Sequence, residues 1–124
     1  MARRITQAGS KRLTLPGRFT LEMVSGEIGS HVTFRVVEIP VAKPGEALRG
    51  PHLHHGYEEC MYVLKGTGTT LSESGDLPVK AGDVVLVPPE EKHVTRNTGS
   101  EPLVLLCFFP TDNIERSTEN FPSF

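Results

Sequence analysis

The fold is constrained above all by a hydrophobic period of two that returns along much of the chain. Phe19, Leu21 and Met23 alternate with polar residues, and the same alternation spans residues 32–36. Further strand-like segments follow at a spacing of about ten residues, and they lie at 59–64, 67–72, 83–87, 93–97 and 103–109. We therefore predict an all-β fold built of short strands, a small antiparallel β-barrel or sandwich.

Turn-forming residues separate these segments and exclude a bundle of long helices. The chain has 12 glycines and 10 prolines, spread between the segments rather than gathered in tracts. With 124 residues it is long enough for one core only. We expect a basic arm or strand at 1–18, the barrel at 19–110, and a C-terminal tail at 111–124 that packs on the barrel through Phe121 and Phe124.

The charge pattern argues against nucleic acid and membrane as partners. The net charge is −2, and the basic residues that precede Glu22 are expected to form a solvated strand or tail. No apolar run approaches the roughly 18 residues of a membrane span and no apolar signal segment begins the chain, so we expect a cytoplasmic protein.

Cys60 and Cys107 lie in apolar strands and are expected to be reduced and buried, with a disulfide between them as the open alternative.

The chemistry of the chain is concentrated in its histidines. Alternate residues of a strand point the same way, so His52 and His54 can present two imidazoles to one point. Glu59 lies an odd number of residues after His54 and would face away unless the chain turned, and Gly56 supplies that turn. With His93, three imidazoles and a carboxylate can bind a mid-row transition metal and leave coordination positions for water or substrate.

The spacing of these residues resembles the cupin superfamily, whose first motif runs G-x5-H-x-H-x3-4-E-x6-G. His52, His54, Glu59 and Gly66 stand at the corresponding positions of this chain. The first glycine of the motif is displaced, because six residues separate Gly45 from His52 and the motif has five between its glycine and its first histidine. This departure affects a loop and removes no potential ligand.

The second cupin motif runs G-x5-P-x-G-x2-H-x3-N. Here it reads Gly82, Pro88, Glu90, His93 and Asn97, with the glutamate in place of the second glycine. A short segment, 67–81, separates the two motifs, as in single-domain microbial cupins. The resemblance implies the cupin jelly roll, a double-stranded β-helix, in which the motif glycines and the asparagine have structural roles.

The same resemblance implies one divalent transition metal per chain, either Fe, Mn, Zn or Ni. Its ligands would be His52, His54, Glu59 and His93. We choose this glutamate over its neighbour Glu58 because only Glu59 keeps the six-residue spacing to the motif glycine.

The remaining polar residues of the motif region are candidates for catalysis and substrate binding. His55 is expected at the rim of the site, with replacement of one metal ligand as the alternative, and His31 is expected to be structural or exposed. The candidates for acid–base catalysis are His55, Tyr57 and Glu58. The candidates for substrate contact are Arg35, Arg49, Met61 and Thr95, and the two arginines could hold a carboxylate.

Cupins of this size imply a metal-dependent enzyme of the dioxygenase, decarboxylase or isomerase type. Its substrate would be a small oxygen-rich organic molecule such as a hydroxy or dicarbonyl acid. The alternative is a non-catalytic module that binds a sugar or an organic acid, with a structural or ligand-capturing metal. Small barrels of this type usually associate through a sheet face, so we expect a homodimer that uses the N-terminal arm and the strand at 103–109, which is apolar on both faces.

Overall fold

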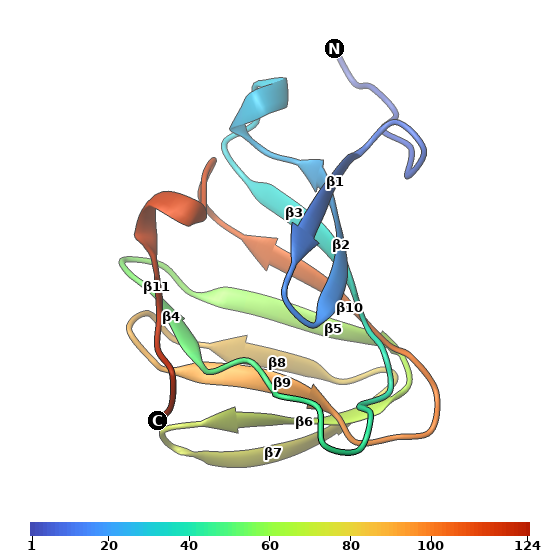
Figure 1. Cartoon of the computed structure of the whole chain (residues 1–124). Coiled ribbons are helices and arrows are strands. Elements are labelled where there is room, and N and C mark those ends of the chain that lie inside the picture. The colour runs from blue at the N-terminus through green and yellow to red at the C-terminus, as the bar shows by residue number, and fades with distance from the viewer.

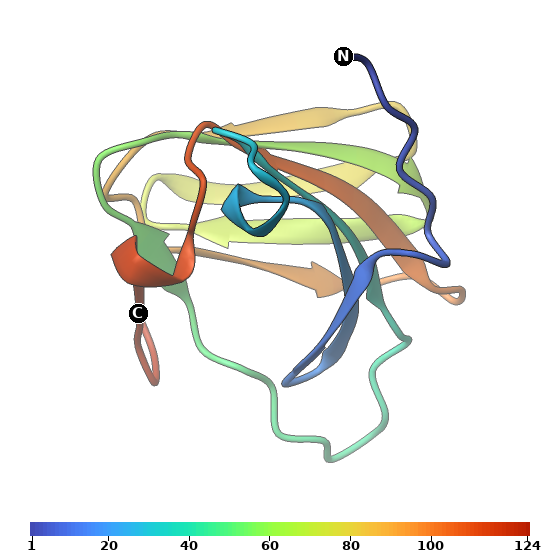
Figure 2. The ribbon, with the colours of Figure 1, turned by 90° about the horizontal axis from the view of Figure 1, so that it is seen from above.

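The computed structural model describes residues 1–124 and consists mainly of strands in two antiparallel sheets, which curve around a shared interior (Figures 1 and 2). The six-stranded sheet has the order β1-β2-β3-β10-β5-β8, with the bounds Lys11–Leu15, Arg18–Val24, Thr33–Ile39, Leu103–Phe109, Glu59–Lys65 and Val84–Val87. The five-stranded sheet has the order β11-β4-β9-β6-β7, with the bounds Thr118–Asn120, His52–His54, His93–Asn97, Thr67–Ser72 and Gly75–Lys80. The helical segments are the single turns Gly26–Ile28 and Glu115–Ser117, and no helix has the length and apolar character needed to cross a membrane. The predicted all-β fold is confirmed.

Most strands that the alternation did not indicate are edge strands, and the exception is β4, which lies between β11 and β9. All five later segments expected from the sequence are present, as β5, β6, β8, β9 and β10. By contrast, β1, β7 and β11 each lie at the end of a sheet. An edge strand pairs on one side only, so it can be short or contain a proline, as β7 does at Pro78. Such strands lack the strong apolar alternation by which buried strands are recognised.

In β2 and the first half of β3, polar residues face the interior and their apolar neighbours face outward. Phe19 is 66% exposed, whereas Thr20 is 3% exposed and Arg35 is 8% exposed. The period of two is present as expected, but the buried side of these segments is the polar one, and apolar Val37 joins it only toward the end of β3. Polar side chains therefore line the space that β2 and β3 enclose.

The hydrophobic core lies mainly between β5, β8 and β10. Eleven buried residues form one cluster, in which Met61 of β5 lies opposite Cys107 of β10. The Cys107 side chain is buried, whereas that of Cys60 lies on the other face of β5 and is only partly buried. Both cysteines are free, so no disulfide links the two strands.

Both ends of the chain are attached to the sheets. β1 pairs along its whole length with β2 of the same chain, and β11 pairs with β4. Beyond β11, the Phe121 N–H donates to the Pro51 carbonyl at 2.9 Å, and the Lys92 ammonium lies 4.1 Å from the centre of the Phe121 ring. Phe124 is exposed, so it is Phe121 that holds the tail against the barrel.

Candidate metal centre

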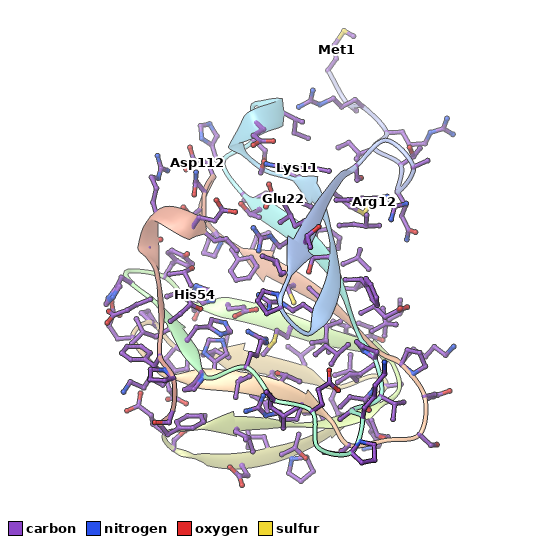
Figure 3. The ribbon with its side chains drawn as sticks, viewed as in Figure 1. Met1, Lys11, Arg12, Glu22, His54 and Asp112 are labelled. Carbon is purple, nitrogen blue, oxygen red and sulfur yellow. The ribbon has the colours of Figure 1, made fainter.

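Four side chains from three strands meet between the two sheets. β4 carries His52 and His54, β5 begins with Glu59, and β9 begins with His93. β4 and β9 are neighbours, and His52 lies opposite His93 in their register. One potential ligand atom from each residue lies within 4.8 Å of the other three. Figure 3 shows His54 on β4, among side chains that fill the space between the sheets.

The connection between β4 and β5 explains why the glutamate joins the histidines. The chain leaves one sheet after His54 and enters the other at Glu59, so the carboxylate approaches the imidazoles from the opposite sheet. Gly56 lies in this connection with φ of 86°, a left-handed conformation that glycine adopts without strain. The Glu59 Oε1 atom is 3.2 Å from Nε2 of His54 and 3.0 Å from Nε2 of His93.

Hydrogen bonds on the far side of two rings direct their Nε2 atoms toward this carboxylate. Nδ1 of His93 lies 2.9 Å from the Glu91 carbonyl, which can only accept, so Nδ1 carries the proton. Nδ1 of His54 lies 2.9 Å from the Thr118 hydroxyl, and that hydroxyl donates to the Ile114 carbonyl at 2.6 Å. Nδ1 of His54 is therefore also a donor. This arrangement is typical of metal-ligating histidines, because it orients the ring and leaves Nε2 as the ligand atom.

The cluster holds a buried carboxylate in its ionised form. Burial raises the pKa of Glu59, but hydrogen bonds from His54 and His93 outweigh it and hold this pKa well below its usual range. Burial lowers the pKa of His93, yet the hydrogen bond and charge of Glu59 raise it overall. Burial, together with the nearby His93, lowers the pKa of His52 to about 2, so this imidazole is neutral.

These four donors fit a divalent transition metal. At least one histidine must carry an Nε2 proton to hydrogen-bond with Glu59, and a cation bound by the same atoms would replace that proton. Three imidazole nitrogens and one carboxylate oxygen are suited to Fe, Mn, Zn or Ni. The cluster could hold such an ion, and four protein ligands leave positions for water or substrate.

A cavity of about 450 Å³ lies beside the cluster, and all four candidate ligands line it. Two of the four candidates for substrate contact, Met61 and Thr95, also line the cavity. The Thr95 hydroxyl is 2.9 Å from that of Thr70, which is likewise buried. The space is large enough for a small organic molecule in contact with the cluster.

The two arginine candidates also line the cavity but have different partners. Nε and Nη2 of Arg35 both donate to Oε2 of Glu22, at 2.9 and 2.7 Å, so this guanidinium is held in a buried ion pair. Arg49 lies beside the cluster, with Nη1 3.4 Å from Nδ1 of His52, and forms no ion pair. Burial, with the nearby charges of Arg18 and Arg96, lowers the pKa of Arg49 to about 10, and the group stays cationic at neutral pH.

None of the three acid–base candidates lines the cavity. His55 and Glu58 are exposed. The His55 ring lies between Glu119 and Glu90, and hydrogen bonds to these carboxylates, the stronger effect coming from Glu119, raise its pKa. Tyr57 is half-buried, and its ring stacks on that of His54 with the ring centres 5.6 Å apart.

Asn97 and Gly66 of the two motifs have structural contacts. The Asn97 amide donates to the carbonyls of Ile39 at 2.9 Å and Glu101 at 2.8 Å. Gly66 has φ of 91°, and a side chain there would place its Cβ 2.7 Å from the Pro102 carbonyl oxygen. Both residues shape the loops that join the strands.

Glu90, which stands where the second cupin motif has glycine, adopts a left-handed conformation with φ of 66°. It is the one residue other than glycine with a positive φ. Its N–H donates to the His54 carbonyl at 2.9 Å, and its carboxylate accepts from the Gly56 N–H at 2.9 Å. The Glu90 side chain therefore stabilises the turn that precedes Glu59.

We expect Glu90→Gly protein to be more stable than Glu90→Ala protein by about 1 kcal/mol. Both variants lose the carboxylate that holds the turn, but only alanine keeps the strain of a Cβ at this φ. Urea unfolding of the two variants measures the difference. Equal free energies of unfolding would contradict a backbone cost at this position.

Several cavity residues were not indicated by the sequence, and two of them are polar residues of β2. Arg18 and Thr20 of β2 line the cavity, although the sequence pattern placed Arg18 in a solvated arm. The available signal was the shared face of alternate residues in β2, which groups Arg18 with Thr20 and Glu22. Period alone does not say which face of a strand is buried.

Known proteins match part of this chain. The oxalate-binding protein of Thermotoga maritima is 40% identical over 64 residues, which cover 52% of this chain and 52% of that protein. A glucose-6-phosphate isomerase of Thermococcus gammatolerans is 42% identical over 59 residues, which cover 44% of this chain and 31% of the isomerase. The chain thus spans about half of the first relative's length and less than a third of the second's.

A solved structure shares the fold, and a family profile assigns the family. Oxalate decarboxylase of Lactobacillus farciminis, solved with formate, superposes with a TM-score of 0.77 at 21% identity, over 92% of this chain and 34% of that chain. The profile of the cupin domain matches residues 41–109, more than half of the chain, and both motifs with their four potential ligands lie inside this range. The chain belongs to the cupin family.

Proposed function

We propose that the chain binds one divalent transition metal, either Fe, Mn, Zn or Ni, through His52, His54, Glu59 and His93, and that it is a metal-dependent enzyme acting on a small oxygen-rich organic acid. One observation carries the proposal: these four donors line a cavity of about 450 Å³ beside an arginine with no carboxylate partner, Arg49. The ligands suit a metal, and the arginine suits the carboxylate of a substrate.

In such a site, different residues bind the metal and the substrate. Glu59 and the three histidines hold the metal, so Glu59 is not free to act as a general base. Arg49 attracts and orients the carboxylate of the substrate at the side of His52. A divalent ion held by these residues would polarise substrate oxygens as a Lewis acid or, as Fe(II), would supply dioxygen activation.

The named relatives support an acid or a polyhydroxylated molecule as ligand. One is called an oxalate-binding protein and another a glucose-6-phosphate isomerase. Each matches this chain over only part of its length, so the reaction itself is a proposal from the site. The two free cysteines favour a reducing compartment, and we propose the cytoplasm.

A second candidate function is a non-catalytic module that captures an organic acid or a sugar. It is favoured by the positions of His55, Tyr57 and Glu58, none of which lines the cavity. In that case the metal would bind the ligand or stabilise the barrel without turnover.

Incubation with a panel of hydroxy and dicarbonyl acids separates the two functions. We expect the metal-loaded protein to consume at least one acid in the panel, as followed by NMR, and His54→Ala protein to lose that turnover while remaining folded. Binding of an acid without consumption would favour the capture module. If His54→Ala instead lowers the melting temperature of the metal-loaded protein and leaves ligand binding unchanged, the metal is structural.

We also propose that the protein is a homodimer. Exposed apolar side chains share the outer face of the six-stranded sheet over β5, β8 and β10, and we call this set the outer apolar face: Tyr62, Leu64, Val84, Leu86 and Phe108. The outward apolar residues of β2 and β3, which are Phe19, Leu21, Phe34 and Val36, extend this face. A second copy of the chain would cover it.

A further inference from the structure

One wall of the cavity is formed by the hairpin of β1 and β2 and carries an unpaired cation. Leu15, Pro16 and Arg18, at the tip of this hairpin, line the cavity. The Arg18 guanidinium donates to the Pro16 carbonyl at 2.9 Å and is in no ion pair with a carboxylate. Burial, together with the charge of Arg35, lowers its pKa.

The next inward residue of β2 offers an unused hydrogen-bonding group. Thr20 is 3% exposed and lines the same cavity. Its Oγ1 is the one buried side-chain nitrogen or oxygen in the structure without a hydrogen-bond partner. A buried hydroxyl without a partner destabilises a folded protein, so its presence in a cavity wall indicates a partner that arrives with a ligand.

Two of the arginines that line the cavity have no carboxylate partner. Arg35 is paired with Glu22 and lies 3.6 Å from Glu115, which also lines the cavity, while Glu59 belongs to the histidine cluster. Arg18 and Arg49 remain in the cavity wall and are in no ion pair. An anionic group beside Arg18 would neutralise this charge and replace lost hydration.

We propose that Arg18 and Thr20 form a second recognition subsite that binds a far oxyanion group of the substrate, while Arg49 holds the carboxylate at the end that faces the histidine cluster. The substrate is then a small molecule with two anionic groups, and the far group is a carboxylate or a phosphate. This inference rests on the proposed function and deepens it, because it names the substrate class and assigns the specificity to the β1–β2 hairpin.

Calorimetric titration of the metal-loaded protein tests the subsite. The probes are malonate, succinate and glutarate, and the half-amide of each, which keeps one carboxylate and replaces the other by a neutral amide. We expect at least one dicarboxylate to bind more tightly than its half-amide. Arg18→Gln is expected to weaken that dicarboxylate roughly 10- to 100-fold, the usual cost of a lost hydrogen bond to a charged group, and to leave the half-amide and the metal content nearly unchanged.

Arg12→Gln is the matched control, because Arg12 is an exposed arginine on the paired strand β1, well apart from His54 (Figure 3). It is expected to bind every probe as the wild type does. Phosphonoacetate, which replaces one carboxylate of malonate by a phosphonate, distinguishes the two sources of the oxyanion. If it binds more tightly than malonate and depends on Arg18 to a greater degree, the far group is a phosphate.

Thr20→Val gives a second, independent readout. Valine has nearly the same shape and removes the partnerless hydroxyl, so we expect a higher melting temperature for the ligand-free protein. We also expect dicarboxylate affinity to fall roughly 3- to 10-fold, the usual worth of a neutral hydrogen bond. A purely structural threonine would not raise stability and lower affinity together.

The outcomes separate the subsite from the function on which it rests. If Arg18→Gln and Thr20→Val bind the dicarboxylates as tightly as wild type, the subsite is wrong and the metal-dependent function stands. Equal loss for dicarboxylate and half-amide in Arg18→Gln also overturns the subsite, because the residue would then act on the whole cavity. If no acid binds to the metal-loaded protein, both proposals fail.

Discussion

Wild-type protein purified without a nickel column is expected to carry about one equivalent of divalent metal per chain, and the His52→Ala/His54→Ala variant none. The double substitution removes two of the four donors and leaves a single imidazole and a carboxylate from opposite sheets, which cannot hold the ion against water. Elemental analysis by mass spectrometry measures the effect and identifies the metal. Iron or manganese would direct the substrate search to oxygenase and decarboxylase reactions, and zinc to Lewis-acid reactions.

Two further variants make this result specific. His31→Ala removes an exposed histidine outside the cluster and should leave the metal content unchanged. Glu59→Gln preserves the volume of a buried side chain but removes the charge that the histidines hold, so it should lose metal without creating a cavity. A wild-type protein that stays folded yet takes up no metal when Fe, Mn, Zn and Ni are offered would overturn the metal-dependent function.

The second prediction with a large effect concerns assembly. Light scattering of the wild type at micromolar concentration should give a molecular mass twice the 13.6 kDa of one chain. Leu86→Glu is expected to reduce this to the mass of one chain. Leu86 is 56% exposed on β8, within the outer apolar face, so the substitution costs the single chain little but would bury a charge in the dimer.

Leu48→Glu is the matched control for the assembly experiment. Leu48 is also 56% exposed, but it lies outside the strands and away from the outer apolar face. It should remain a dimer. A monomeric wild type would overturn the homodimer, and a Leu86→Glu variant that stays dimeric would move the interface to another surface.

Much of the fold was predictable because its signals are local in sequence. Period-two alternation and turn residues identify β5, β6, β8, β9 and β10, since a strand and a turn each depend on a few neighbouring residues. The edge strands β7 and β11 were not predicted. Their residues carry little apolar pattern, and they are strands because the neighbouring strand, β6 or β4, supplies the hydrogen bonds.

The four potential metal ligands were predictable for a related reason. His52 and His54 share a face by the geometry of one strand, and the motif spacing added Glu59 and His93 before any contact was known. The structure brings all four together. Spacing did not reveal that the carboxylate reaches the histidines from the opposite sheet, because that depends on how the sheets face each other.

The roles of the arginines depended on contacts that no spacing encodes. Arg35 and Arg49 were equal candidates in the sequence, but Arg35 lies opposite Glu22 in the register of β2 and β3 and pairs with it. The sequence predicted that Arg18 lies in a solvated basic arm, because the residues before it include other basic residues and no acidic ones. In the structure the hairpin of β1 and β2 brings Arg18 to the cavity.

The sequence by itself determined the short strands, the turns between them and the spacing of the histidines and the glutamate, because each of these depends on local backbone geometry. Only the tertiary structure decided which face of each strand is buried. In β2 the apolar residues occupy one face and the polar residues the other, and this pattern does not say which face is buried. The inward face is set by the strands that pair with β2 and by the sheet that lies across from it. That choice put Thr20 and Arg18 beside the histidine cluster and left Phe19 on the outside.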